Sequence, residues 1–152
     1  RDSLLAVSGQ LDRTIGGRPY DNVTDIGSPR RTVYALVNRN DLPGIFRAFD
    51  FADPDASAGE RPRTTVPQQA LFGLNSPFVL EVSRRLGNST AGAEETVRIQ
   101  TLYRRVLVRE PSADELAAAR NFVKNASGDG KLDAWGRLAQ VLLLTNEFAF
   151  VD

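Results

Sequence analysis

Three carboxylates lie within six positions of one another in a proline- and charge-rich stretch of this chain. They belong to Asp50, Asp53 and Asp55, and the same stretch ends with Arg61 and Arg63. Closely spaced carboxylates could hold a calcium ion, or act as acid and base on a glycan. Arginine matches carboxylate and sulfate groups, so a sulfate or a uronate is a second candidate ligand. These five residues are the candidate ligand-binding residues of the chain.

A structural role for the same residues is the competing interpretation, and the charge balance favours it. Arg30, Arg31 and Arg39 precede the aspartates, so the charge of the region nearly cancels, whereas an exposed anion site would carry surplus base. Aspartate near proline is common in turns, and the aspartate spacing differs from that of an EF-hand loop. We therefore expect the flanking arginines to pair with aspartates of residues 50–63, here called the Asp/Arg loop, and to fix this loop onto the helices, with at least one of the three aspartates bonded to an arginine.

The residue types that are absent restrict the chemistry further. The sequence contains no histidine, cysteine or methionine. The common zinc and copper sites, iron–sulfur clusters, haem ligands, Cys/His pairs and Ser-His-Asp triads therefore cannot be built from this chain alone. We assign no catalytic residue and no metal ligand. A calcium ion on the Asp/Arg loop is the one cofactor left open.

Length and charge indicate a neutral chain of one domain, residues 1–152, or the C-terminal part of a larger domain. Its 152 residues are enough to bury a core. Nineteen basic and nineteen acidic residues cancel, so we expect no nucleic-acid partner. No apolar run reaches the roughly 18 residues of a membrane span. The chain begins at Arg1 without methionine or a signal peptide, which suggests an excised or processed piece of a longer protein.

Helical periodicity dominates the sequence and predicts a mainly α-helical, irregular domain of five to six helices around the helix of Trp135. The main helical patterns cover residues 2–12, 65–75, 77–87, 97–107, 112–123 and 133–145. Residues 42–50 could hold a further short helix. Residues from Thr32 to Asn38 are rich in β-formers, which predicts one short extended segment. The Asp/Arg loop is expected to be long and irregular.

The corner between two of these helices is specified by residue type. Thr65 and Gln68 have the spacing of a capping box at the start of the first helix. Asn75 could end that helix in a left-handed conformation, and Ser76 followed by Pro77 could cap and open the next one.

Two further helix starts are predicted near the C-terminus. Ser112 and Glu115 again have capping-box spacing, and Asp133 can cap the last long helix. Trp135 lies at helical spacing among leucines in that helix, so we expect it in the core instead of on a carbohydrate-stacking surface.

Several separated motifs, in order, resemble a known family. They occupy residues 1–9, 30–34, 49–50, 53–55, 63–71, 75, 102–111, 115–116 and 135–148. In these motifs the chain resembles the domain of unknown function 1553, the C-terminal module of secreted planctomycete surface-cytochrome-type proteins. The likeness covers nearly the whole chain, and apparently only the C-terminal part of the family's domain. In the Leu-Gly-Arg-x-Pro motif of the family, Val108 stands in place of glycine, which argues against a positive backbone φ there.

The resemblance implies a location and partners, and it implies no catalytic residues. It implies export to the periplasm or cell surface, beside upstream domains of the same protein that include a cytochrome c-like one. It also implies proximity to polysaccharide-related functions, which makes a glycan a candidate partner. We expect a non-enzymatic structural or interaction module of a multidomain protein. The alternative is a contribution of the Asp/Arg loop to a carbohydrate-active, calcium-binding or anion-binding site.

Overall fold

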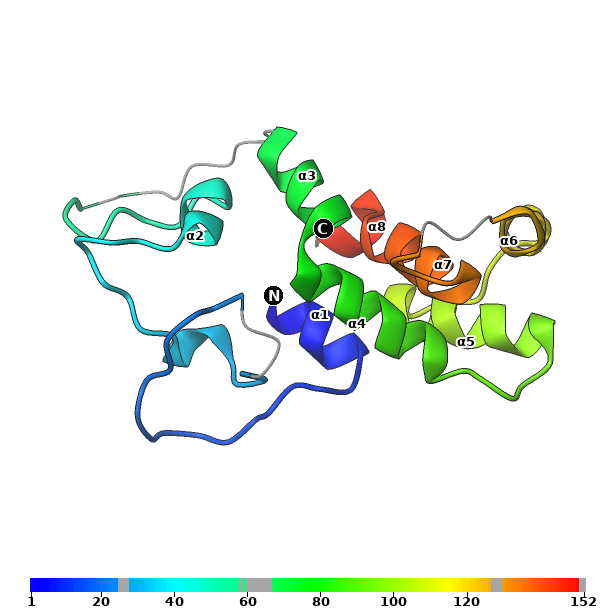
Figure 1. The fold of residues 1–152 in the computed structure, drawn as a ribbon, viewed down its shortest axis with the longest axis horizontal. Helices are drawn as coiled ribbons and strands as arrows, with labels where there is room; N and C mark the ends of the chain where they lie inside the picture. The colour runs from blue at the N-terminus through cyan, green and yellow to red at the C-terminus, as the bar shows by residue number, and fades with distance from the viewer. Residues whose placement is uncertain (25–27, 58, 60–66, 127–129, 151–152) are drawn as a thin grey trace.

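The computed structural model describes residues 1–24, 28–57, 59, 67–126 and 130–150 of the chain (Figure 1). These residues form eight α-helices, one 3-10 helix and no β-strand, so the prediction of a mainly helical fold is confirmed. In chain order the elements are α1 (Asp2–Val7), η1 (Thr32–Tyr34), α2 (Gly44–Ala48), α3 (Pro67–Asn75), α4 (Pro77–Asn88), α5 (Glu95–Leu107), α6 (Ala113–Asn125), α7 (Ala134–Leu143) and α8 (Asn146–Ala149).

The described part holds more helices than the five to six expected, because the chain adds short ones. The last predicted helix is interrupted: α7 ends at Leu143, and the four-residue α8 starts after Thr145. The Thr145 hydroxyl accepts a hydrogen bond from the Phe148 N–H at 3.3 Å, which caps a new helix instead of extending the old one.

Two parts are visible in Figure 1. Helices α1 and α3–α8 form a helical body, and the described residues between 12 and 57 form a loop lobe that carries η1 and α2. Most of the fully buried side chains lie in the helical body, with contributions from α1, α4, α5 and α7. The largest of these are Leu5, Phe78, Val79, Val82, Leu86, Ile99 and Leu102, and Val23 is fully buried in the loop lobe.

Helices α4 and α7 cross with their backbones in near contact. A Cβ atom on Gly87 of α4 would lie 2.7 Å from the backbone nitrogen of Gly136 and 2.8 Å from the carbonyl carbon of Trp135. Only glycine permits this approach, which lets the flanking leucines and valines interdigitate at core density. Trp135 packs on the core as predicted, and the Arg98 guanidinium lies 3.7 Å from its ring centroid.

Arg1 joins the loop lobe to the helical body. Its side chain is only 4% exposed and donates hydrogen bonds to the carbonyl oxygens of Val23, Ser28 and Arg30. The guanidinium also lies 5.6 Å from the ring centroid of Phe78, at the start of α4. A buried cation needs such partners, because an unpaired one would be costly.

The predicted extended segment from Thr32 to Asn38 is only partly extended, because Asp2 intervenes. The Asp2 carboxylate accepts hydrogen bonds from the Thr32 N–H at 2.8 Å and from its hydroxyl at 2.5 Å, and the chain then turns through η1. Extended backbone resumes at Ala35, where the N–H of Leu36 donates to the carbonyl of Tyr20 at 2.9 Å. This parallel pairing is an isolated bridge, so no strand forms.

Helix α1 is shorter than the predicted 2–12. It ends at Val7 because Gly9 adopts a left-handed conformation, with φ of 74°. The N–H groups of Gln10 and Leu11 both donate to the carbonyl of Leu5, which closes the helix end.

The α3–α4 corner forms where predicted but by other means. Asn75 is not left-handed: it belongs to α3, and its side-chain amide donates to the carbonyl of Leu71 at 3.2 Å. Ser76 and Pro77 open α4 as expected, although the Ser76 side chain makes no capping hydrogen bond. Thr65, the first half of the predicted capping box, lies outside the described residues.

The expectation for Val108 is wrong. Val108 follows α5 in the left-handed conformation, with φ of 58°, and its side chain is 87% exposed. A β-branched residue is strained in this region of backbone space. The α5–α6 turn therefore keeps the glycine-type conformation without the glycine.

We expect Gly87→Ala to destabilise the chain by about 2 kcal/mol, because the added methyl meets backbone that cannot move independently of α7. Urea unfolding followed by circular dichroism measures the change. Gly44→Ala in α2 is the control, since a Cβ there meets no atom within 4 Å. Equal midpoints for the two variants would contradict the close crossing.

Val108→Gly should stabilise the chain by about 1 kcal/mol, because it relieves the left-handed strain and removes a side chain that packs on little. Val108→Ala keeps the Cβ and should recover less. Thermal melting of the three proteins tests this, and a glycine variant no more stable than the alanine variant would refute it.

Candidate functional site

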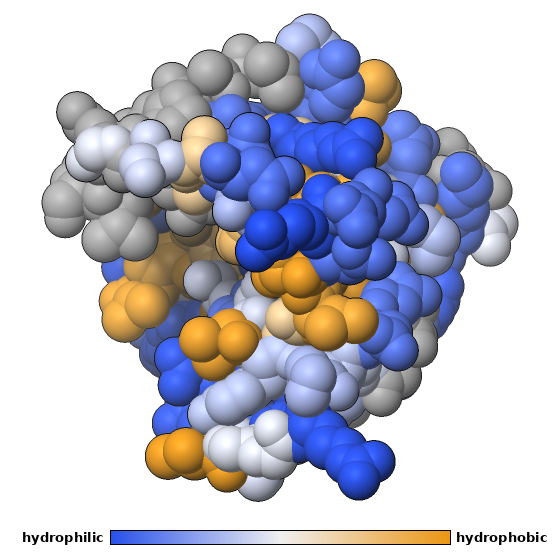
Figure 2. All heavy atoms as spheres, turned by 90° about the vertical axis from the view of Figure 1, so that its left-hand side faces the viewer, coloured by the Kyte–Doolittle hydropathy of each residue, from blue (hydrophilic) through white to orange (hydrophobic). Residues whose placement is uncertain are grey.

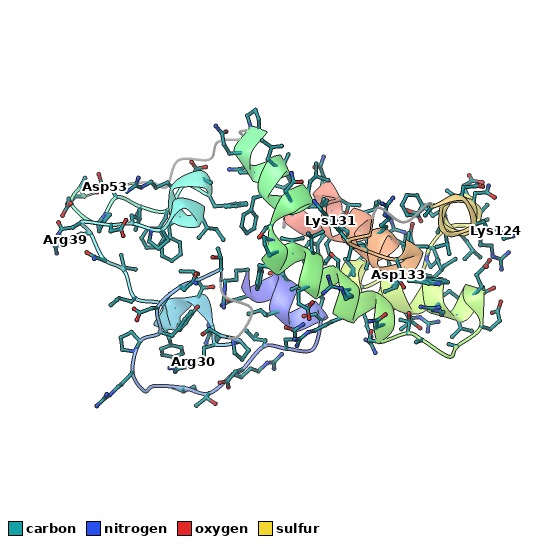
Figure 3. All side chains as sticks on the ribbon, in the orientation of Figure 1. Arg30, Arg39, Asp53, Lys124, Lys131 and Asp133 are labelled. Atoms are coloured by element: carbon teal, nitrogen blue, oxygen red, sulfur yellow. The ribbon has the colours of Figure 1, made fainter. Side chains whose placement is uncertain are left out.

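Asp50 follows closely on α2, and Figure 3 places Asp53 beside Arg39 at the outer end of the loop lobe. The Oδ1 atom of Asp55 lies 3.5 Å from an Nη atom of Arg39, which confirms that one of the three aspartates of the Asp/Arg loop pairs with an arginine. The two side chains are 58% and 68% exposed, so the pair adds little stability. Arg61 and Arg63 lie outside the described residues.

Asp50 and Asp53 both hold turns of the backbone. Asp50 follows α2 with φ of 52°, and the N–H of Phe51 donates back to the carbonyl of Phe46 at 2.9 Å, which is the pattern of a left-handed helix end. The Oδ1 atom of Asp53 accepts from the N–H of Asp55 at 2.9 Å, an Asx turn. Each aspartate thus has a structural role in the loop.

No calcium site is formed by the part of the chain that the structure describes. Within residues 1–24, 28–57, 59, 67–126 and 130–150, no three carboxylates gather closely enough to hold a metal ion. A calcium ion prefers six or more oxygen ligands, which the described aspartates of the loop do not assemble.

A hollow of about 310 Å³ opens between α2 and the Asp/Arg loop. It is lined by Arg39, Leu42, Arg47, Phe51, Asp53 and Pro54. Sequence reasoning identified Asp53 and Arg39 but not Arg47 or Phe51. Phe51 reaches the hollow because the chain reverses at the end of α2, and its ring stacks on the buried Phe46 with centroids 4.5 Å apart.

A second charged cluster lies in the helical body, where the turn between α5 and α6 meets α8. Arg109 donates two hydrogen bonds to Glu115, at 2.7 and 2.8 Å, and two to Glu147 of α8, at 2.7 and 2.9 Å. These bonds hold the pKa of both carboxyl groups below the usual range, and that of Glu115 falls to about 2. The pKa of the Arg109 guanidinium rises for the same reason.

The cluster also contains the predicted capping box of α6. The Ser112 hydroxyl accepts from the Glu115 N–H at 3.2 Å, and the Glu115 carboxylate accepts from the Ser112 N–H at 2.7 Å. Capping-box spacing is a local signal that sequence reasoning detects. The bond from Arg109 to Glu147, across 38 residues, has no local signal and was missed. This arrangement ties the turn after α5 to both α6 and α8.

A second hollow of about 360 Å³ is bordered by α3, α6 and α7, and its lining combines apolar side chains, here called the apolar surface, with the polar Asn75, Lys131, Arg137 and Gln140. Leu74, Phe122 and Val141 line it and are 54%, 37% and 49% exposed. The side-chain amide of Gln140 donates to the carbonyls of Gly73 and Leu74, which fixes the end of α3 against α7.

The sequence matches the model of the family PSD1, described as a protein of unknown function (DUF1553), over residues 1–123. The chain belongs to the DUF1553 family. The DUF1553 match runs from α1 into α6 and so includes the Asp/Arg loop and the Arg109 cluster up to Glu115, whereas α7 and α8 lie beyond it. No curated protein and no solved structure matches the chain.

None of the helices that the structure describes in this DUF1553 chain is both long and apolar enough to cross a membrane. The longest, α5 and α6, have 13 residues each. A bilayer-spanning helix needs about 20 predominantly apolar residues.

Glu115→Gln should lower the melting temperature, by an amount that depends on pH. The folded-state pKa of Glu115, about 2, lies below its ordinary value of 4.5, so its contribution is complete above pH 4.5 and is lost as the pH falls toward 2. The gap between parent and variant should therefore be constant near neutrality and close in acid. Asp114→Asn, in the same first turn of α6, controls for loss of a charge near the helix N-terminus. A gap unchanged down to pH 2 would contradict the clamp.

Proposed function

We propose that this DUF1553 chain is a non-enzymatic structural or interaction module of a longer, exported protein. The support is the use that the chain makes of its polar groups. Arg1, Arg98 and Arg109 each tie one segment to another, and Asp50 and Asp53 hold turns. Side chains with these structural roles build a rigid scaffold, and they are poorly placed to exchange protons with a substrate.

The apolar surface carries the proposal, because it is what such a scaffold would present to a partner. Single exposed leucines are ordinary on protein surfaces. Here Leu74, Phe122 and Val141 come from three helices and surround one hollow, and Leu71 and Leu144 are also exposed on α3 and just after α7. Gathered apolar side chains with a polar rim are typical of protein-docking surfaces. We infer that another domain of the same exported protein docks there, and a cytochrome c-like domain is one such candidate.

A carbohydrate-active site is the alternative, and the geometry of the first hollow weighs against catalysis there. Glycoside hydrolysis generally uses two carboxyl groups on either side of the scissile bond. Among the described residues, Asp53 is the one carboxylate that lines the hollow, and it already accepts the hydrogen bond of an Asx turn. We therefore propose binding, and no reaction, for this part of the molecule.

Val141→Asp should weaken docking of the remaining domains of the longer protein, added in trans, by at least about ten-fold. A charge in the centre of an apolar interface would be desolvated without a partner. Val97→Asp is the matched control, because Val97 is also a helical valine and is 46% exposed, on α5. Isothermal titration calorimetry gives both affinities, and circular dichroism confirms that both variants fold. Equal loss in both variants, or no association of the parent chain, would overturn the proposal.

A further inference from the structure

We propose that the hollow between α2 and the Asp/Arg loop binds a hexuronate, a six-membered sugar ring that carries a carboxylate. The inference rests on the residues of that hollow and is independent of docking at α3, α6 and α7. It concerns binding, and no bond of the sugar is made or broken.

One of the side chains that line the hollow is an aromatic ring stacked on a second, buried ring. Phe51 lines the hollow and stacks on Phe46 with an interplanar angle of 20°. Phe46 is buried, with 6% of its surface exposed, so the stack is anchored in the lobe. The hydrogen bond from the Phe51 N–H to the Phe46 carbonyl also fixes the backbone that carries the outer ring. An aromatic ring with one face covered and its surroundings open is suited to the flat C–H face of a sugar.

Two arginine side chains line the same hollow as this ring. Arg47 comes from α2 and Arg39 from the segment before it, and both line the hollow. Arg39 also meets Asp55 at 3.5 Å, an exposed contact through one of its Nη atoms that leaves other N–H donors of the fork for a ligand. Two guanidinium groups on one hollow suit a carboxylate, because an arginine can donate two parallel hydrogen bonds to it.

Asp53 supplies a hydrogen-bond acceptor to the same hollow, in addition to the arginine donors. Its Oδ1 atom is used in the Asx turn, whereas Oδ2 has no part in that bond and can accept from a ligand hydroxyl. Figure 3 shows Asp53 and Arg39 at the same tip of the lobe. Figure 2, which looks at this end of the molecule, shows apolar atoms exposed among strongly polar side chains.

These three features select one class of ligand. A bare anion such as sulfate would use the arginines but not the aromatic ring, and a neutral sugar would leave the arginines without a charged partner. An aromatic acid has no hydroxyl to donate to Asp53, whose carboxylate would then face an anion without compensation. A hexuronate offers a ring face, a carboxylate and hydroxyl donors together.

The test is titration of the 152-residue chain with sodium galacturonate, followed by nuclear magnetic resonance shifts of the backbone amides. Galactose and sodium acetate are the matched probes, because each carries one half of the ligand. We expect galacturonate to bind with a dissociation constant on the order of 1 mM, with shifts centred on Arg47, Phe51 and Asp53. Galactose and acetate should each bind at least about ten-fold more weakly.

Variants separate the site from general effects of charge. Arg47→Gln should reduce galacturonate affinity at least about ten-fold, whereas Arg31→Gln, an exposed arginine of the same lobe that does not line the hollow, should leave it unchanged. Phe51→Leu should weaken galacturonate more than acetate, and its melting curve shows whether the lobe remains folded. Acetate that binds as tightly as galacturonate, galactose that does so, no galacturonate shifts, or an unchanged Arg47→Gln variant would each overturn the proposal.

Discussion

The backbone contact between α4 and α7 is the constraint on which the rest of the structure depends. Gly87 lets the backbone of α4 approach that of α7 at Trp135 and Gly136 more closely than any larger residue would allow, and the core side chains on both helices fill the space that this distance leaves. Helices α1, α3, α5 and α6 each pack against one or both members of this pair. The scaffold is therefore built outward from one crossing, and both hollows lie at its periphery.

Outside the core, three arginine side chains link separate segments of the chain, and each binds a different kind of partner. Arg1 bonds backbone carbonyls of the loop lobe, Arg98 covers the ring of Trp135, and Arg109 holds two carboxylates. These partners suit a planar fork with five donors, which lysine could not replace. The neutral net charge of the chain thus reflects internal pairing together with exposed charges of both signs.

The sequence alone predicts the local structure correctly where a capping side chain and its backbone partner lie within one helical turn. Ser112 with Glu115, and Asp133 at the start of α7, behave as the spacing predicts. Prediction failed where a distant partner decides the local conformation. Asp2 turns the chain at Thr32, thirty residues away, and so shortens the extended segment that the composition favours. At Val108 the residue type was misleading: the turn adopts a left-handed conformation although this conformation is unfavourable for a β-branched residue.

In the candidate site, too, local features could be predicted from the sequence and long-range contacts could not. Turn roles for aspartates near proline could be predicted, and so could a pair with an arginine, here Asp55 with Arg39. The presence of Arg47 and Phe51 in the same hollow could not be predicted. It depends on the left-handed end of α2 at Asp50, which reverses the chain and stacks Phe51 on Phe46. A periodicity argument places residues on helix faces and carries no information about such a reversal.

The anchoring of the loop lobe by Arg1 has a consequence for how this region tolerates change. Arg1 binds the lobe through main-chain oxygens at positions 23, 28 and 30, and every amino acid supplies such an oxygen. A substitution at position 28, whose side chain is only partly buried, can therefore alter what the lobe displays without displacing its path. Position 30 is different, because the Arg30 side chain donates hydrogen bonds to the carbonyls of Gly16 and Arg18. The same anchor makes position 1 intolerant, since no other side chain reaches three carbonyls with one planar group. The exposed side chains of the lobe can thus vary as long as Arg1 keeps its hydrogen bonds to the three carbonyls.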